Sequence, residues 1–201
     1  MPDYSIEQSL HEKGYTYVCG IDEAGRGPLC GPVFAAACIL PDGLYIEGLN
    51  DSKKLTEAKR EKLYDVITHE AIAWCVAHAT VEEINDTDIL SAALLAMRRA
   101  IDGLSVKPDF ALIDGNISRG FTLPTKTVIH GDAISPSIAA ASILAKVTRD
   151  RICYELDAAY PQYGIAKHKG YSTKAHMDAL REYGPAPIHR TKFIRFLDRE
   201  N

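Results

Sequence analysis

The chain has 201 residues, of which 46% are hydrophobic and 25% are charged, so it suits one globular domain with an ordinary core. Its five cysteines are odd in number and form no C-x-x-C pair, which argues against a disulfide framework and indicates a reducing compartment. The longest apolar run, 33–40, is too short for a membrane helix, and residues 1–14 are too polar for a secretory signal. We therefore expect a cytoplasmic protein with no membrane partner.

The charge is divided unevenly along the chain, although the net value is only −4. Residues 1–140 contain 12 Lys and Arg against 20 Asp and Glu, whereas residues 141–201 contain 11 against 7. Phosphate contacts come from local basic patches rather than from net charge, so the basic last third is compatible with a polyanionic partner. An ordinary solvated face is the alternative explanation.

Hydrophobic runs and turn residues predict five strands that alternate, in the second half, with helices. Residues 1–14 are a loose or helical lead-in, and strands are expected at 15–21, 33–40, 71–80, 110–113 and 125–129. Helices are expected at 56–70, 88–104, 135–160 and 173–183, with a loop over 161–171 and a short last helix that ends near 198. The two later strands should lie parallel to the first. The fold class is therefore α/β, a mixed five-stranded sheet flanked by helices.

Acidic residues stand at the ends of three of these strands. Asp22 and Glu23 follow the first, Asp114 follows the fourth, and Asp132 follows the fifth. Parallel strands bring their carboxyl ends to one edge of a sheet, so we expect these four side chains to meet there. An all-oxygen set suits Mg²⁺ or Mn²⁺, and two such ions about 4 Å apart can activate water against a phosphodiester. For Asp114 or Asp132 alone, a turn role is the alternative.

A glycine-rich turn, Gly25-Arg26-Gly27, comes directly after the first acidic pair. It lacks the Lys-Ser/Thr ending of a phosphate loop. A dinucleotide fingerprint would open a helix, whereas here Pro28 and Gly31 lead into another strand. The turn is better explained as bare backbone that approaches a sugar-phosphate chain, where backbone groups can contact a ribose 2′-hydroxyl.

These motifs, taken together, resemble those of type 2 ribonuclease H (ribonuclease HII), and the similarity covers nearly the whole chain. The matching segments are Asp22-Glu23-Ala24-Gly25-Arg26-Gly27-Pro28, Gly31-Pro32-Val33, Asn50-Asp51-Ser52-Lys53-Lys54-Leu55, Lys107-Pro108-Asp109, Asp114-Gly115, Gly131-Asp132, the apolar run 138–147 with Arg149-Asp150, His168-Lys169-Gly170-Tyr171 and His189-Arg190. The resemblance implies a ribonuclease H-like catalytic domain over 1–160 and a small helical C-terminal extension over 161–201 packed on it.

The resemblance also implies an activity. The protein is expected to hydrolyse the RNA strand of RNA–DNA hybrids, including single ribonucleotides embedded in duplex DNA, by a two-metal mechanism that leaves 5′-phosphate and 3′-hydroxyl ends. The metal-binding catalytic residues would be Asp22, Glu23, Asp114 and Asp132, with Mg²⁺ or Mn²⁺ as cofactor. Gly25, Arg26 and Gly27 would sense the 2′-hydroxyl at the RNA–DNA junction, and Tyr171 would stack on the following deoxyribose. A catalytically silent hybrid-binding module of the same fold is the alternative.

Several other residues have expected but less specific roles. Lys53, Lys146 and Arg149 are candidate phosphate contacts, with solvated charges as the alternative, and the protein is expected to be a monomer. Ser137 or Ser142 could position a phosphate or water, or could serve in helix capping or packing. His168, His176 and His189 show no ligand spacing and are expected to be structural or weak phosphate neighbours. Lys192 and His130 depart from the family pattern, which leaves local substrate contacts open.

Overall fold

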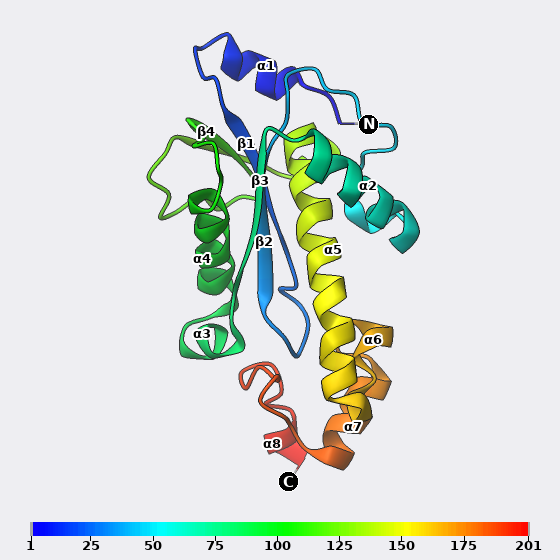
Figure 1. Cartoon of the computed structure of the whole chain (residues 1–201). Coiled ribbons are helices and arrows are strands. Elements are labelled where there is room, and N and C mark those ends of the chain that lie inside the picture. The colour runs from blue at the N-terminus through cyan, green and yellow to red at the C-terminus, as the bar shows by residue number, and fades with distance from the viewer. Residues whose placement is uncertain (1, 201) are drawn as a thin grey trace.

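The computed structural model describes residues 2–200 and has a five-stranded mixed sheet between two layers of helices (Figure 1). The strands are β1 (Val18–Ala24), β2 (Val33–Ile39), β3 (Ala73–Ala79), β4 (Phe110–Asp114) and β5 (Thr125–Val128), in the order β3-β2-β1-β4-β5. The first three pair antiparallel, and β4 and β5 run parallel to β1. The predicted mixed sheet and its parallel half are confirmed.

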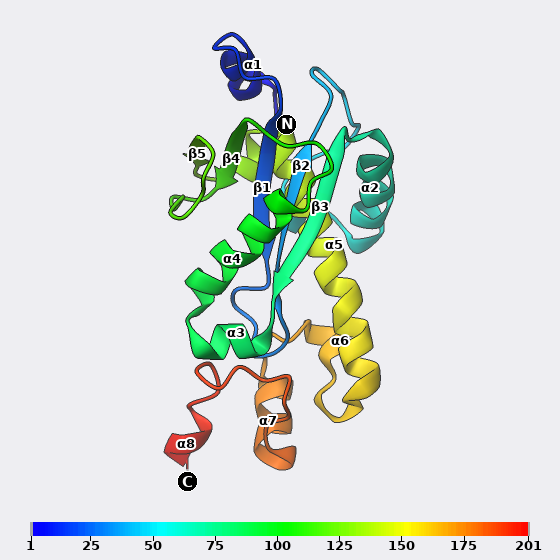
Figure 2. The same cartoon turned by 60° about the vertical axis from the view of Figure 1, so that its left-hand side comes forward.

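Helices cover both faces of the sheet (Figure 2). They are α1 (Ser5–His11), α2 (Glu57–Glu70), α3 (Val81–Asp86), α4 (Ile89–Asp102), α5 (Pro136–Ala159), α6 (Ile165–His168), α7 (Lys174–Tyr183) and α8 (Leu197–Glu200). Helix α4 packs on one face, and α5 lies on the other with α2 beside it. None of the helices in this described part of the chain combines the length and apolar character needed to cross a bilayer.

Two short helices were not predicted. Helix α3 begins with a capping box, in which the Thr80 hydroxyl accepts from the Glu83 amide and the Glu83 carboxylate accepts from the Thr80 amide. Helix α6 has four residues inside the expected loop 161–171, too few to show a helical period. Both connect larger elements, so their omission leaves the predicted mixed five-stranded sheet unchanged.

Strand β1 begins three residues later than predicted, because its first residues bind elsewhere. The backbone amides of Thr16 and Tyr17 donate to the two carboxylate oxygens of Asp109 at 2.7 and 3.0 Å. At its other end β1 continues to Ala24, with Asp22 opposite Ala36 and Glu23 opposite Ala35 of β2. The acidic pair is therefore held inside regular pairing rather than on a loose turn.

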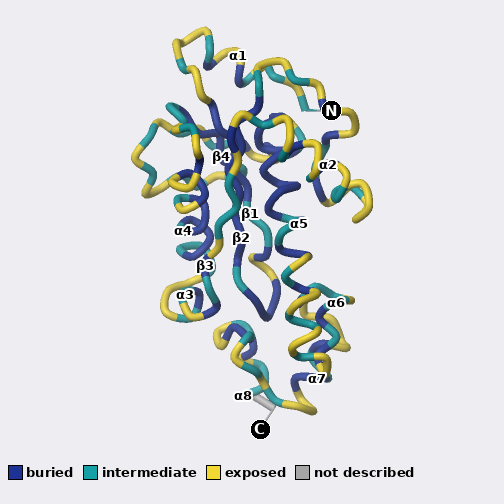
Figure 3. The backbone as a smooth tube through the Cα atoms, viewed as in Figure 1, coloured by how far each residue is buried: buried dark blue, intermediate teal, exposed yellow. Residues whose placement is uncertain are grey.

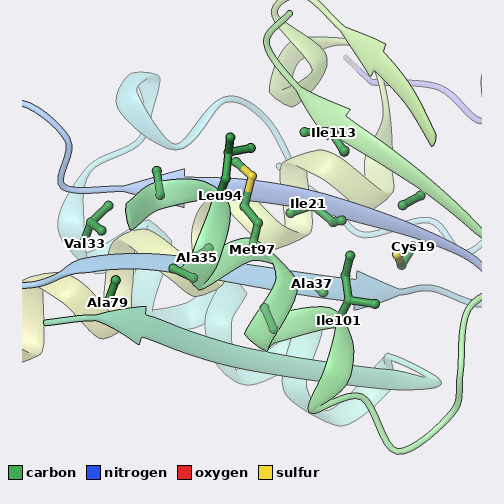
Figure 4. Close-up of a cluster of buried hydrophobic side chains, with 14 of the residues drawn as sticks. Cys19, Ile21, Val33, Ala35, Ala37, Ala79, Leu94, Met97, Ile101 and Ile113 are labelled. Carbon is green, nitrogen blue, oxygen red and sulfur yellow. The ribbon is translucent and has the colours of Figure 1, made fainter. Parts of the chain in front are cut away.

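Small side chains let the layers approach closely. The cluster between the sheet and α4 contains many alanines together with larger residues such as Ile21, Met97 and Ile113 (Figure 4). On the other face, a Cβ on Gly20 would lie 2.1 Å from the carbonyl carbon of Ser137, so α5 rests directly on β1. Strands β1, β2 and β4 and the first half of α5 are accordingly buried along most of their length, whereas β3 and β5 are only partly buried (Figure 3). This packing gives Asp22, two residues further along β1, a rigid support.

The residues after α5 gather at its far end, where α6 and α7 lie (Figure 1). They pack in a separate hydrophobic cluster that joins Cys153 of α5, Leu29 and Cys30 of the turn after β1, and Tyr163, Leu180 and Ile194. The division at residue 160 stays a prediction.

Candidate active site

The four predicted acids converge at one edge of the sheet. Strands β1 and β4 pair in parallel up to Ile21 opposite Ile113, so Asp22 and Asp114 are the next residues on adjacent strands. The Asp114 Oδ1 accepts a hydrogen bond from the Gly131 amide at 2.7 Å. That bond ties the end of β4 to the turn that contains Asp132.

The carboxylates are buried close to one another, which disfavours their charged forms. Asp22 is only 4% exposed, and burial, with Glu23 and Asp114 next in effect, raises its pKa well above the usual range. Burial also raises the pKa of Glu23, against the lowering effect of Arg26. For Asp132 burial again comes first, followed by the charges of Asp114 and Asp51.

This donor set fits a divalent cation. The Oδ2 atom of Asp132 is buried without a hydrogen-bond partner among the described residues, and its nearest cation, the Lys53 Nζ, is 3.7 Å away. Clustered carboxylates that lack enough cations are costly, and a hard ion with oxygen ligands would relieve that cost. The four acids therefore fit the metal site that the sequence predicts.

A cavity of about 200 Å³ lies beside the acids and brings most of the predicted site together. Its lining includes Asp22, Glu23, Gly25, Arg26, Gly27, Lys53, Lys146, Arg149 and Tyr171. A neighbouring cavity of about 120 Å³ shares Glu23 and Arg26 and adds Asp114. Asp132 lines neither of these two cavities, and its Oδ2 lies 3.7 Å from the Nζ of Lys53, which lines the first.

The glycine-rich turn lies between the acids and Tyr171. Gly25 has φ +100°, and a Cβ there would lie 2.5 Å from the Arg149 Nε, so both backbone and space require glycine. A Cβ on Gly27 would lie 3.3 Å from the Tyr171 ring, which is itself 46% exposed. The Arg26 guanidinium reaches back to the Glu23 carboxylate at 3.2 Å. Turn, acid and aromatic ring thus form one continuous surface.

The three predicted basic residues occupy different environments. The Lys53 side chain is exposed, and the Lys146 ammonium donates to the Asp150 carboxylate at 2.7 Å. Arg149 is only 3% exposed and donates to the Lys169 carbonyl at 2.6 Å. The alternative that Arg149 is a solvated charge is therefore wrong, because the side chain lies beneath the cavity.

The histidines are brought together by the fold although their spacing in the sequence shows no pattern. His176 and His189 are buried with their Nε2 atoms 3.2 Å apart, and the His168 ring stacks on His176 at 4.5 Å. Cys30 lies close enough that its Sγ and one ring nitrogen each of His176 and His189 fall within 4.8 Å of one another. The hydrogen bond between the His176 and His189 rings explains why these residues lie together, and it indicates a structural role for the cluster.

Sequence reasoning missed three residues around the site. Arg190 is fully buried and binds the backbone of the glycine-rich turn; the His189-Arg190 pair was noticed but received no role. Asp51 contributes to the raised pKa of Asp132, and its place in the segment 50–55 was the available signal. Ser52 bonds Ser142, hydroxyl to hydroxyl, at 2.9 Å.

The two departures from the family pattern have structural explanations. Lys192 extends its ammonium to the backbone carbonyl of Thr87, just before α4. His130 adopts the left-handed conformation, with φ 56°, immediately before Gly131. Neither residue lines the cavity beside the acids.

Residues 19–196 match the sequence model of the family described as Ribonuclease HII. The chain belongs to the ribonuclease HII family. Proteins named Ribonuclease HII from Desulfitobacterium hafniense and Caulobacter vibrioides are each 56% identical to it, over 187 and 189 residues. These alignments cover 93% and 94% of this chain and 72% and 88% of the relatives.

Solved structures agree with this assignment. The ribonuclease H2 of Pyrococcus horikoshii is 27% identical, with a TM-score of 0.75 over 92% of this chain and 98% of its own. The RNase HIII named Bst-RNase HIII, solved in complex with Mn²⁺, has a TM-score of 0.69 at 19% identity over 94% of this chain and 66% of its own, and so supports the fold alone. As a ribonuclease HII, the chain is a metal-dependent endoribonuclease that acts on the RNA of RNA–DNA hybrids. The predicted family and ribonuclease H-like fold are confirmed.

Proposed function

We propose that this ribonuclease HII cleaves next to ribonucleotides at RNA–DNA junctions, including a single ribonucleotide embedded in duplex DNA. The products would carry 5′-phosphate and 3′-hydroxyl ends. The observation that carries the proposal is the placement of Asp22, Glu23 and Asp114 with the Gly25–Gly27 turn and Tyr171 along two adjoining cavities. A site that only hydrolysed phosphodiesters would need the acids and no surface for the sugar.

In this proposal Asp22, Glu23, Asp114 and Asp132 hold two ions of Mg²⁺ or Mn²⁺. When bound, the ions supply a more acidic water and neutralise charge at the leaving oxygen. Lys53 and Lys146, on the cavity lining, would bind phosphate oxygens of the scissile strand. The buried Arg149 would support the Tyr171 loop through the Lys169 carbonyl, in addition to any contact with phosphate.

In this proposal the Gly25–Gly27 turn and Tyr171, which lie beside the acids, distinguish ribose from deoxyribose. The Gly25–Gly27 backbone has no side chain that would keep a ribose away, apart from Arg26, whose guanidinium bonds the Glu23 carboxylate. The exposed part of the Tyr171 ring offers a flat apolar surface to the next sugar, where a 2′-hydroxyl would lose its hydration. Such an arrangement favours a ribonucleotide followed by a deoxyribonucleotide.

The test uses a DNA duplex with one central ribonucleotide, labelled at the 5′ end and incubated with Mg²⁺ or Mn²⁺. We expect a single cut next to the ribonucleotide, and no cut in the all-DNA duplex or in EDTA. A protein that cut only within long RNA tracts would contradict the roles given to the turn and to Tyr171. The Asp22→Asn variant should remain folded and should not cut the one-ribonucleotide duplex with either Mg²⁺ or Mn²⁺.

We further propose that the enzyme acts as a cytoplasmic monomer, with a catalytic unit over 1–160 to which the extension 161–201 contributes Tyr171. Light scattering during gel filtration should give the mass of one 22.1 kDa chain. A dimer in that measurement would contradict the monomer.

A further inference from the structure

The guanidinium of Arg190 is bonded entirely to backbone carbonyls of one short segment, 25–32. Its Nε donates to Gly31 at 2.9 Å, its Nη1 to Arg26 at 3.1 Å and Pro28 at 2.9 Å, and its Nη2 to Gly25 at 2.7 Å and Pro32 at 3.2 Å. A guanidinium has five N–H groups, so every donor is used. No carboxylate is among these partners, although the side chain is fully buried.

An arrangement of this kind is expensive, because a buried cation normally takes an anionic partner. Burial, with the charge of Arg149 next in effect, lowers the pKa of Arg190 to about 10, so the side chain is still protonated at neutral pH. Five carbonyl dipoles take the place of a counter-ion. The geometry of the turn and the charge of Arg190 therefore depend on each other.

The carbonyl directions fix the amide directions. In a planar trans peptide the C=O and the following N–H point to opposite sides. Because the carbonyls of Gly25 and Arg26 face Arg190, the amides of Arg26 and Gly27 face away from it. Neither amide donates to another residue in the described part of the chain. Arg190 is buried beneath the turn, whereas Gly25, Arg26 and Gly27 line the cavity beside the acids.

The backbone around Arg190 holds the same turn. The Arg190 amide donates to the Leu29 carbonyl and the Gly31 amide donates to the Ile188 carbonyl, each at 2.8 Å, which pairs the two segments antiparallel. The residue before Arg190 contacts a second part of the site: the His189 ring bonds His176, whose Nδ1 lies 3.1 Å from the Tyr171 carbonyl. One C-terminal segment thus reaches both sugar-contacting elements.

We propose that Arg190 is a positioning residue for ribose recognition, which presents the Arg26 and Gly27 amides to the 2′-hydroxyl by holding the preceding carbonyls inward. This inference rests on the proposed function, since it explains how the turn would distinguish ribose from deoxyribose. An amide N–H in this position can donate to a hydroxyl oxygen that deoxyribose lacks. Lysine cannot replace Arg190, because one ammonium with three donors cannot reach five carbonyls arranged around a planar fork.

The main test compares Arg190→Lys with the matched control Arg195→Lys, an exposed arginine five residues further on. Binding is measured by fluorescence anisotropy with Ca²⁺ in place of the catalytic metal, for a one-ribonucleotide duplex and an all-DNA duplex of the same sequence. Wild type and Arg195→Lys should prefer the ribonucleotide. Arg190→Lys should lose about tenfold in that preference, the value of one or two hydrogen bonds, with all-DNA binding retained.

A retained preference in a folded Arg190→Lys variant would overturn the proposal. If the lysine variant does not fold, the test is an NMR titration of the wild-type protein labelled with ¹⁵N in its glycines. The Gly27 amide signal should shift on addition of the one-ribonucleotide duplex and not of the all-DNA duplex, and an unchanged signal overturns the proposal. If the wild type neither prefers nor cleaves the one-ribonucleotide duplex, the proposed function itself fails. If it does both and the lysine variant matches it, only the assignment of Arg190 fails.

Discussion

The carboxylate of Asp114 and the backbone amide of Gly131 are joined by a 2.7 Å hydrogen bond that sets the distance between two of the four acids. Asparagine at 114 keeps an oxygen that accepts this bond but loses the charge. We therefore expect Asp114→Asn to fold normally and to lose cleavage by at least about a thousandfold, within the range that a missing metal ligand can cost.

Comparison of Asp114→Ala with Asp114→Asn separates the hydrogen bond to Gly131 from the charge. It removes the acceptor as well as the charge, so the Gly131 amide loses its partner, and we expect about 1–2 kcal/mol of lost stability. Urea unfolding of both variants in EDTA measures the difference. Equal stability of the two would mean that the Gly131 bond does not order the Asp132 turn.

Divalent metal should stabilise the folded protein, because it neutralises acids that repel one another when the site is empty of cations. Ion at about a hundredfold excess over its dissociation constant should add about 2.7 kcal/mol. Thermal unfolding with EDTA, Mg²⁺ or Mn²⁺ measures the shift. In Asp22→Asn the shift should largely disappear, while the melting temperature in EDTA should equal or exceed that of the wild type.

The ring of Tyr171, rather than its hydroxyl, is expected to matter for substrate choice. The hydroxyl makes no hydrogen bond to any residue that the structure describes, whereas the ring lies so near the turn that a Cβ on Gly27 would be 3.3 Å from it. Tyr171→Phe should thus keep nearly all activity on the one-ribonucleotide duplex, and Tyr171→Ala should lose about tenfold or more in kcat/KM, as for the removal of one stacking partner. A large loss in the phenylalanine variant would transfer the role to the hydroxyl.

Acid should destabilise the fold partly through His189. Burial lowers its pKa from 6.5 to about 4, so between these values the unfolded chain binds a proton that the folded chain does not. Stability from this residue is therefore complete above pH 6.5 and is lost as the pH falls toward 4, with a slope of at most about 1.4 kcal/mol per pH unit. Urea unfolding of wild type and His189→Gln across this range should show a shallower slope in the variant.

The sequence contained enough to predict the sheet and to group the four acids, because strand ends and acidic residues are local signals. It also placed the Gly25–Gly27 turn correctly between two strands, since glycine and proline mark turns directly. The start of β1 was misplaced because Asp109, 92 and 93 residues away, takes the amides of Tyr17 and Thr16. Such a competition leaves no trace in local periodicity.

Arg190 shows the stronger limit of sequence reasoning. Its hydrogen-bond partners are backbone carbonyls up to 165 residues away. Every residue type has such a carbonyl, so the partners cannot be recognised from the sequence. The basic excess of 141–201 was compatible with a polyanionic partner or with an ordinary solvated face, whereas Arg149 and Arg190 are both buried. Two of the eleven Lys and Arg residues in 141–201 thus donate hydrogen bonds to backbone carbonyls inside the protein. This weakens the argument that the charge of this segment indicates a polyanionic partner.

The order of the site along the chain has a consequence for biosynthesis. The last of the four acids is residue 132, whereas Tyr171 and Arg190 follow 39 and 58 residues later. A ribosome therefore releases every proposed metal ligand before Arg190 and Tyr171, the residues proposed to hold and complete the sugar-binding surface. Premature termination between residues 132 and 171 would leave a fragment with all four acids and without Tyr171 or Arg190. On the proposed roles, sugar selectivity is then the last property that the nascent chain acquires.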